Sequence, residues 1–199
     1  MQRKAIAALM ISLLLLSACG HGAGEQTFEA FRDTLTGKLD LPAQVRVQRG
    51  DTVTDYTLTC QELPDGYDLT VTAPEQTAGV TAHLRDGAST LAFDDMILPA
   101  GDLNGAGLTP LTALPYVVQA IRSGYVDLTW TEDGLQVVQL ITDDHTAVRL
   151  YLDGTVPQCA ELSVDDTLCL RCTMENWNLE QGSTNDESQD QNLGRDQSQ

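Results

Sequence analysis

The spacing of hydrophobic and polar residues changes three times along the chain, and these changes predict its elements. Residues 28–35 carry apolar side chains on one helical face, with Thr27 as the expected N-cap. From residue 41 onward the period becomes two, which is typical of strands with one buried face. A second helical pattern covers residues 111–123, and the period of two then returns as far as residue 174. The order predicted is helix, strands, helix, strands.

Most of the predicted sheet consists of short strands between turn residues. They are expected around residues 45–47, 56–60, 67–71, 80–84 and 91–93 before the second helix, and at 126–130, 135–141, 147–152, 159–164 and 168–174 after it. Gly and Asp cluster between these segments, as they do in tight turns. We therefore predict a meander of antiparallel strands, each buried on one face.

The last two strands also predict their own register. A three-residue loop at residues 165–167 sets Glu161 opposite Arg171, an opposite-charge cross-strand pair. On the other face, the same register predicts the pairs Val164–Leu168, Leu162–Leu170 and Ala160–Cys172.

The first twenty residues have the three parts of a secretory signal. Basic residues Arg3 and Lys4 precede an apolar run from Ala5 to Leu16. This run is shorter than the roughly 20 residues that a membrane-spanning helix needs. Small residues then lead to a cysteine. The pattern predicts cleavage after residue 18, in an ordinary secreted protein or in a lipoprotein.

The motif Leu16-Ser17-Ala18-Cys19 resembles the bacterial lipobox, in which the cysteine is acylated and becomes the mature N-terminus. The resemblance implies a lipoprotein signal peptide at 1–18 and acyl chains, such as palmitate, on Cys19. Two chains suffice for stable membrane anchoring. We expect a flexible tether at 19–26, one folded domain at 27–178, and a disordered tail at 179–199, because that tail has too little apolar surface to fold.

Charge limits the partners of the chain. The formal net charge is −18, and loss of Arg3 and Lys4 with the signal takes it two units further, to −20. This much negative charge argues against nucleic acid and against adhesion to anionic lipid headgroups. We therefore expect the acyl anchor, and not surface charge, to hold the protein at the extracytoplasmic face of the cell membrane.

The cysteines beyond Cys19 leave two interpretations open. Cys60, Cys159, Cys169 and Cys172 form an even set, which outside the cytoplasm is compatible with disulfides of undetermined connectivity or with buried thiols. Cys169 and Cys172 have the spacing of zinc and redox motifs. They lie in a strand-like segment, however, where residues three apart point to opposite faces. Zinc or redox chemistry is therefore not expected.

No catalytic constellation is predicted. The three histidines do not belong to a recognisable nucleophile, metalloprotease or phosphate-binding motif. The acidic pairs Asp94-Asp95, Asp143-Asp144 and Asp165-Asp166 could form a carboxylate dyad or a calcium site. Each pair occupies a predicted turn, where Asp suits the backbone geometry. We expect no catalytic residue, no metal and no cofactor.

The order of elements resembles the LolA/LolB-like family of bacterial lipoprotein carriers over about residues 27–178. Residues 90–94 and 95–98 look like mid-sheet strands of clostridial lipoproteins in this group, and residues 156–162, leading into 168–177, look like their closing hairpin. The nearest member in style is a clostridial germination lipoprotein. The resemblance implies an α+β fold: a strongly curved antiparallel sheet, or incomplete β-barrel, with helices on its concave face.

The resemblance implies a non-catalytic protein that binds a lipid, an acyl chain or another apolar ligand in the half-barrel. The expected lining residues are apolar strand positions: Val45, Val47, Tyr56, Leu58, Leu69, Val71, Phe93, Met96, Leu128 and Trp130. These positions could instead form a packed core under the helices. The alternative function is a protein-interaction module or scaffold for an envelope or germination enzyme.

A lipid anchor departs from the shuttling carriers of the family and favours a fixed acceptor, a sensor or an assembly partner. In those carriers an arginine inside the cavity is associated with ligand transfer. Arg46, Arg49, Arg85 and Arg149 all fit strand positions as solvated charges. The sequence therefore predicts no cavity arginine here.

Overall fold

The computed structural model describes residues 22–35, 38–49, 51–101, 103 and 109–174. The expected signal peptide, Cys19 and polar tail lie outside these residues. Within them are the helices α2 (Ala23–Thr34) and α3 (Pro110–Ser123). The strands are β1 (Asp40–Arg49), β2 (Thr52–Leu63), β3 (Gly66–Ala73), β4 (Thr81–Arg85), β5 (Ser89–Phe93), β6 (Met96–Gly101), β7 (Tyr125–Glu132), β8 (Leu135–Ile141), β9 (Thr146–Asp153), β10 (Val156–Val164) and β11 (Thr167–Met174).

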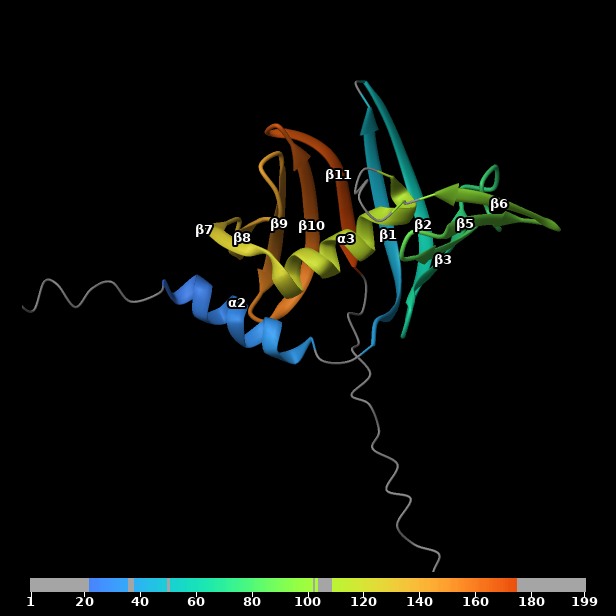
Figure 1. Cartoon of the computed structure of the whole chain (residues 1–199). Helices are drawn as coiled ribbons and strands as arrows, with labels where there is room; N and C mark the ends of the chain where they lie inside the picture. Colours follow the sequence, from blue (N-terminus) through green and yellow to red (C-terminus); the bar gives the residue numbers. More distant parts are fainter. Residues whose placement is uncertain (1–21, 36–37, 50, 102, 104–108, 175–199) are drawn as a thin grey trace, which may run out of the picture.

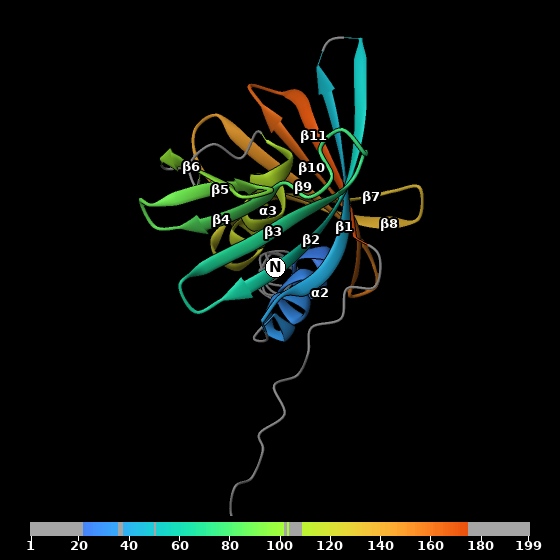
Figure 2. The same ribbon diagram turned by 90° about the vertical axis from the view of Figure 1, so that its right-hand side faces the viewer.

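All the strands belong to one 11-stranded sheet with the order β6-β5-β4-β3-β2-β1-β11-β10-β9-β8-β7. Each half of the chain is an antiparallel meander, and the pairing of β1 with β11 joins the two halves. The sheet curves around α3 without closing, so β6 and β7 remain at its two edges (Figures 1 and 2). The predicted fold class, a strongly curved antiparallel sheet with helices on its concave face, is confirmed.

Helix α3 fills the concave face of the sheet. It begins at a capping box, in which the Thr109 hydroxyl accepts a hydrogen bond from the Thr112 amide, with Pro110 in the first turn. Most of its residues are buried: Thr112, Ala113, Leu114, Pro115, Val117, Val118, Ala120 and Ile121. They pack against β1, β3, β8, β10 and β11, which leaves only a narrow outer side of the helix toward solvent.

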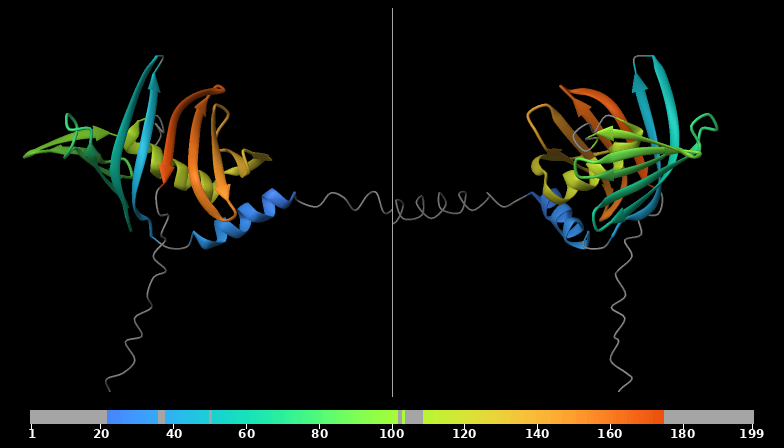
Figure 3. Two further views of the ribbon diagram at one scale, coloured as in Figure 1. Left: turned by 180° about the vertical axis from the view of Figure 1, so that it is seen from behind. Right: turned by 45° about the vertical axis from the view of Figure 1, so that its right-hand side comes forward.

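Helix α2 covers the part of the concave face formed by β7 and β8 (Figure 3). Phe28 and Phe31 are buried, and the Arg32 guanidinium donates hydrogen bonds to the carbonyl oxygens of Ile121 (2.7 Å) and Gly124 (2.8 Å). These carbonyls belong to the C-terminal end of α3, where a positive charge is favourable. The two helices are therefore held together at that end.

The start of α2 corrects the sequence prediction. The helix begins at Ala23 with Gly22 as its N-cap, not after Thr27, so residues that were expected in the tether are helical. The reason is a tertiary contact. A Cβ atom on Gly24 would lie 2.4 Å from the Gln136 amide nitrogen, so the first turn of the helix rests directly on β8. In the described part of the chain, neither helix is long and apolar enough to cross a membrane.

The hairpin of β10 and β11 confirms most of the predicted register. Glu161 pairs with Arg171, and the pairs Leu162–Leu170 and Ala160–Cys172 are also present. The predicted Val164–Leu168 pair is wrong, because Val164 pairs with Thr167 after a register shift. The loop has two residues, Asp165 and Asp166, with φ of 47° and 61°. Such a left-handed turn matches the twist of antiparallel strands, and Asp tolerates it better than most residues.

The resemblance of residues 90–98 suggested that β5 and β6 lie in the middle of the sheet, and this prediction is wrong. They form the hairpin that ends one side of the sheet, and β6 is an edge strand. Met96, Ile97 and Leu98 are consequently 60%, 69% and 60% exposed. Apolar residues on both faces of a strand are typical of a buried strand, which explains the error.

The packing of α3 generates the first prediction. Leu114 is fully buried, so Leu114→Ala should lower the free energy of unfolding by about 2–5 kcal/mol. Gln119→Ala, on the exposed side of the same helix, should change it by no more than about 0.5 kcal/mol. Urea denaturation followed by circular dichroism measures both. Similar losses for the two variants would contradict the assignment of α3 to the core.

Candidate functional site

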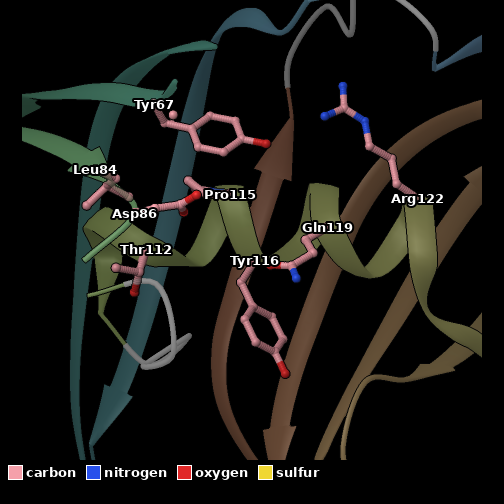
Figure 4. Close-up of a pocket in the computed structure, with 9 residues that line it drawn as sticks. Tyr67, Leu84, Asp86, Thr112, Pro115, Tyr116, Gln119 and Arg122 are labelled. Atoms are coloured by element: carbon pink, nitrogen blue, oxygen red, sulfur yellow. The ribbon is translucent and has the colours of Figure 1, made fainter. Parts of the chain in front are cut away.

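The outer side of α3 forms the floor of a groove with two clefts. The larger cleft, of about 460 Å³, opens toward β3 and β4 and is lined by Gly66, Tyr67, Leu84, Asp86, Thr112, Pro115, Tyr116, Gln119 and Arg122. The smaller, of about 270 Å³, opens toward the β8–β9 turn and is lined by Tyr116, Gln119, Ser123, Gly124, Ile141, Thr142 and Asp143. Tyr116 and Gln119 line both clefts. In Figure 4, Tyr67 and Arg122 lie above α3 and Tyr116 below it.

An ion pair closes one end of the larger cleft. Arg122 donates hydrogen bonds to both carboxylate oxygens of Glu62, at 2.6 and 2.9 Å, and the Leu39 amide donates to the same carboxylate at 3.1 Å. Burial opposes ionisation of Glu62, but these hydrogen bonds outweigh it and hold the pKa of Glu62 below its ordinary value. Arg122 is therefore already neutralised by a partner from β2.

Tyr67 supplies the hydroxyl group at this end of the cleft. Burial, together with the negative charge of Glu62, raises the pKa of Tyr67 to about 12. The phenol is therefore neutral at physiological pH. Asp86 adds one carboxylate to the cleft wall. The charges of Arg122 and Glu62 cancel, so the carboxylate of Asp86 leaves the rim of the larger cleft with a small net negative charge.

Tyr116 connects α3 to the β8–β9 turn and separates the two clefts. Its hydroxyl is hydrogen-bonded to Thr142 and donates to Asp143 at 3.2 Å. Asp143 also accepts hydrogen bonds from the amides of His145 and Thr146. Burial would raise the pKa of Asp143, but these bonds outweigh it and lower the pKa. The charged carboxylate thus fixes the turn against which Tyr116 rests.

The lining residues predicted from sequence lie in three separate places. Val45, Val47, Leu58, Leu69 and Val71 are buried in the sheet, and Tyr56 packs against the same core. Phe93 and Met96 are exposed on the β5–β6 hairpin, while Leu128 and Trp130 lie on β7 at the opposite edge. None of these residues lines either cleft. The structure therefore does not bring the predicted set together.

The residues of the groove were missed because they belong to an amphipathic helix pattern. Thr112, Tyr116, Gln119 and Arg122 recur every three or four residues along α3. This spacing places them on one side of the helix. A polar stripe on a helix is usually a solvated face, so the sequence offers no reason to assign it to a cleft. The arginine at the cleft is Arg122, which the sequence analysis did not consider.

The strand arginines differ from one another. Arg46 is exposed and paired with Asp55, as a solvated strand charge. Arg85 is only 25% exposed and bonds to Asp65 and Asp68, so its interpretation as a solvated charge is wrong. Its guanidinium instead ties the β2–β3 turn to β4. The side chain of Arg49 lies outside the described residues.

The cysteines and acidic pairs do not form a reactive site among the described residues. Cys60, Cys159, Cys169 and Cys172 are free thiols, and burial raises the pKa of Cys172 to about 12. In this part of the chain no group of three or more ligating side chains could hold a metal. Asp94, Asp165 and Asp166 have positive φ, which confirms the interpretation of their pairs as turn residues.

No family model matches the chain, and no curated protein matches its sequence. Solved structures do match, at low sequence identity. A LolA superfamily protein from Nitrosomonas europaea, NE2245, is 13% identical with a TM-score of 0.44, over 73% of this chain and 74% of that one. The lipoprotein LppX of Mycobacterium tuberculosis is 12% identical with a TM-score of 0.40, over 78% and 93%.

A chain from the complex of the CwlD amidase with the GerS lipoprotein of Clostridioides difficile is 16% identical with a TM-score of 0.38. The match covers 80% of this chain and 97% of that one. At such identities and TM-scores, these likenesses do not support an assignment of function. The proposals below therefore rest on the contacts and charges of this chain.

The Glu62–Arg122 pair generates the second prediction. Because the folded-state pKa of Glu62 lies below its ordinary value, its contribution to stability is present above about pH 4.5. That contribution is lost as the pH falls through the folded-state pKa. Glu62→Gln should lower the free energy of unfolding by about 1–3 kcal/mol at pH 7, a range between exposed and buried charged hydrogen bonds.

Urea denaturation at pH 7 and pH 3 measures this effect. The difference between wild type and Glu62→Gln should shrink at the lower pH, because the stabilisation by the charged carboxylate is lost as the pH falls toward and through the folded-state pKa of Glu62. Asp55→Asn, which breaks an exposed pair on the convex face, serves as the control and should cost less at pH 7. A Glu62→Gln penalty that does not change with pH would contradict the role of the charged pair.

Proposed function

We propose that this chain is a lipid-anchored, extracytoplasmic binding protein without catalytic activity. Its groove takes an amphipathic ligand, such as an acyl chain with a polar head. The observation that carries this proposal is the cleft of about 460 Å³ beside α3. Its size falls within the roughly 300–1,000 Å³ of typical small-molecule sites. Its wall combines apolar and aromatic side chains with a few polar groups, as such sites do.

The filled interior determines where the ligand lies. Because α3 occupies the concave face of the sheet, the apolar part of a ligand is placed between α3 and the strands β3 and β4. There it contacts Leu84, Pro115 and the ring of Tyr67. The polar head then lies near the Tyr67 hydroxyl and Arg122. Leu58 and Leu69, which the sequence predicted as lining residues, are buried in the core, so in this proposal they support the groove from beneath and do not contact the ligand.

The charges of the cleft select the head group. Glu62 already neutralises Arg122, and Asp86 adds a negative charge, while the whole chain carries −18. An anionic head would therefore be repelled. We propose a neutral or zwitterionic ligand, such as a diacylglycerol-type lipid, in preference to a free fatty acid.

The same proposal includes the parts of the chain outside the described residues. Residues 1–18 act as a lipoprotein signal peptide, Cys19 carries the acyl chains, the binding domain extends from the start of α2 at Ala23 to residue 178, and 179–199 are a polar tail. A protein fixed to the membrane in this way would act as a stationary acceptor or sensor for a membrane-derived ligand.

The third prediction tests the groove by filling it. Gln119 lines both clefts and is exposed, so Gln119→Trp should block the groove without disturbing the core. In an anchor-free chain that starts at Gly20, binding of a fluorescent diacylglycerol analogue should fall at least tenfold. Ala30→Trp, at an exposed position of α2, should bind as the wild type does. Equal binding by both variants, or no binding by the wild type, would contradict the proposal.

A second candidate function, binding of an envelope protein, is favoured by one observation. Phe93 at the end of β5 and Met96, Ile97 and Leu98 on the edge strand β6 are exposed apolar residues, called here the β6 strip. Contiguous exposed apolar residues usually mark an interaction surface. Asp94 and Asp95 form the tip of the same hairpin. The chemistry fits a protein partner with an apolar patch and basic residues beside it.

The fourth prediction concerns the β6 strip. A photo-crosslinking amino acid at Ile97 should give a discrete adduct in membranes of the native host, and Leu98→Asp should abolish it because a charge cannot enter an apolar interface. The same crosslinker at Val53, an isolated exposed apolar residue at the start of β2, is the control. Identical adducts at both positions, or none at Ile97, would contradict partner binding at this strip.

A further inference from the structure

The distance between the proposed lipid anchor and the folded domain is very short. Helix α2 begins at Ala23, and Gly22 is its N-cap. Two residues, Gly20 and His21, separate Cys19 from Gly22, and a fully extended chain spans at most about 11 Å over these three residue steps. If Cys19 is acylated as proposed above, Gly22 is therefore held within about 11 Å of the bilayer surface.

The first turn of α2 is fixed to one edge of the sheet. A Cβ atom on Gly22 would lie 3.7 Å from the Thr129 hydroxyl of β7, and one on Gly24 would lie 2.4 Å from the Gln136 amide of β8. Phe28 and Phe31 are fully buried further along the helix. Figures 1 and 3 show that the N-terminal end of α2 lies at the side of the domain where β7 lies. The anchor therefore determines which edge of the sheet approaches the membrane.

That edge exposes apolar and aromatic side chains. Tyr125 is 73% exposed and Leu128 is 56% exposed. Trp130 is partly exposed on the same strand, and its indole N–H donates to Glu132 at 3.0 Å. Tyr and Trp are enriched where membranes meet water, because their rings are apolar and their polar atoms can remain hydrated. These three residues are thus suited to the headgroup region of a bilayer.

We infer that the β7 edge is the membrane-facing surface of this protein, with Tyr125, Leu128 and Trp130 in contact with lipid. This inference rests on the proposed acylation of Cys19. Asp127 and Glu132 lie on the same strand and are exposed, so the contact is apolar and not electrostatic. It favours zwitterionic over anionic lipids and persists at high salt.

Fluorescence quenching tests the inference on the full-length, acylated protein. The chain has two tryptophans, Trp130 and Trp177, so Trp177→Phe leaves Trp130 as the reporter. In phosphatidylcholine vesicles, lipids brominated on their acyl chains should quench at least half of the Trp130 emission. Adding Tyr125→Ser and Leu128→Ser should reduce this quenching several-fold. Ile97→Ser, at the opposite edge of the sheet, should leave it unchanged.

Flotation of the same vesicles distinguishes failure of the proposed membrane-facing edge from failure of the proposed anchor. Protein that floats with the vesicles while Trp130 remains unquenched would overturn the membrane-facing edge and leave the anchor intact. Protein that does not float would overturn both the anchor and the inference. A third outcome is that the Trp177→Phe protein is quenched as strongly with Tyr125→Ser and Leu128→Ser as without them. Equal quenching would show that these two side chains do not hold the edge at the membrane, and it would likewise overturn the inference.

Discussion

The burial of the concave face of the sheet by α3 is the constraint on which the other features depend. An open sheet with one apolar face is not stable alone, and α3, with most of its residues buried, covers the middle of this face. Two arginines fix that helix at its C-terminal end. Arg32 bonds to its last carbonyls, and Arg122 reaches Glu62 on β2. The groove exists because α3 fills the interior and leaves only its outer side accessible.

The convex face independently fixes the register of the sheet. Arg46 pairs with Asp55, Arg171 bonds to Glu161, and Arg149 bonds to Gln139. Gln139 in turn donates to Asp127 on the edge strand β7. These polar contacts form a row from β2 to β7 across the strands in between. A slip of one residue in any of these strands would break the row and expose the apolar face at the same time. Both faces therefore specify the same alignment.

The sequence predicted the features that repeat within an element, and it could not predict those that depend on distant contacts. A period of two located most strands, and the Glu161–Arg171 pair predicted the register of the last hairpin. The early start of α2 depends on Gly24 meeting Gln136, which no local pattern reveals. The edge position of β6 is a property of the whole topology. Arg122 was missed for the same reason, since its partner Glu62 lies sixty residues away.

The two ends of the groove differ in charge, and the placement of the charged end agrees with the proposed orientation of the domain at the membrane. Its charged end, at Arg122 and Glu62, lies at the C-terminal end of α3, where Arg32 joins that helix to α2. Because α2 begins at the β7 edge, this is the end of the groove that α2 connects to the proposed anchor. Its other end, at Thr112, lies in the first turn of α3. A lipid that entered from the membrane side would therefore keep its polar head beside Arg122 and Tyr67, while its chain extended along α3 toward the β6 strip. Ligand and partner would then meet at the end of the domain farthest from the bilayer, where an occupied groove could change the surface that a partner contacts.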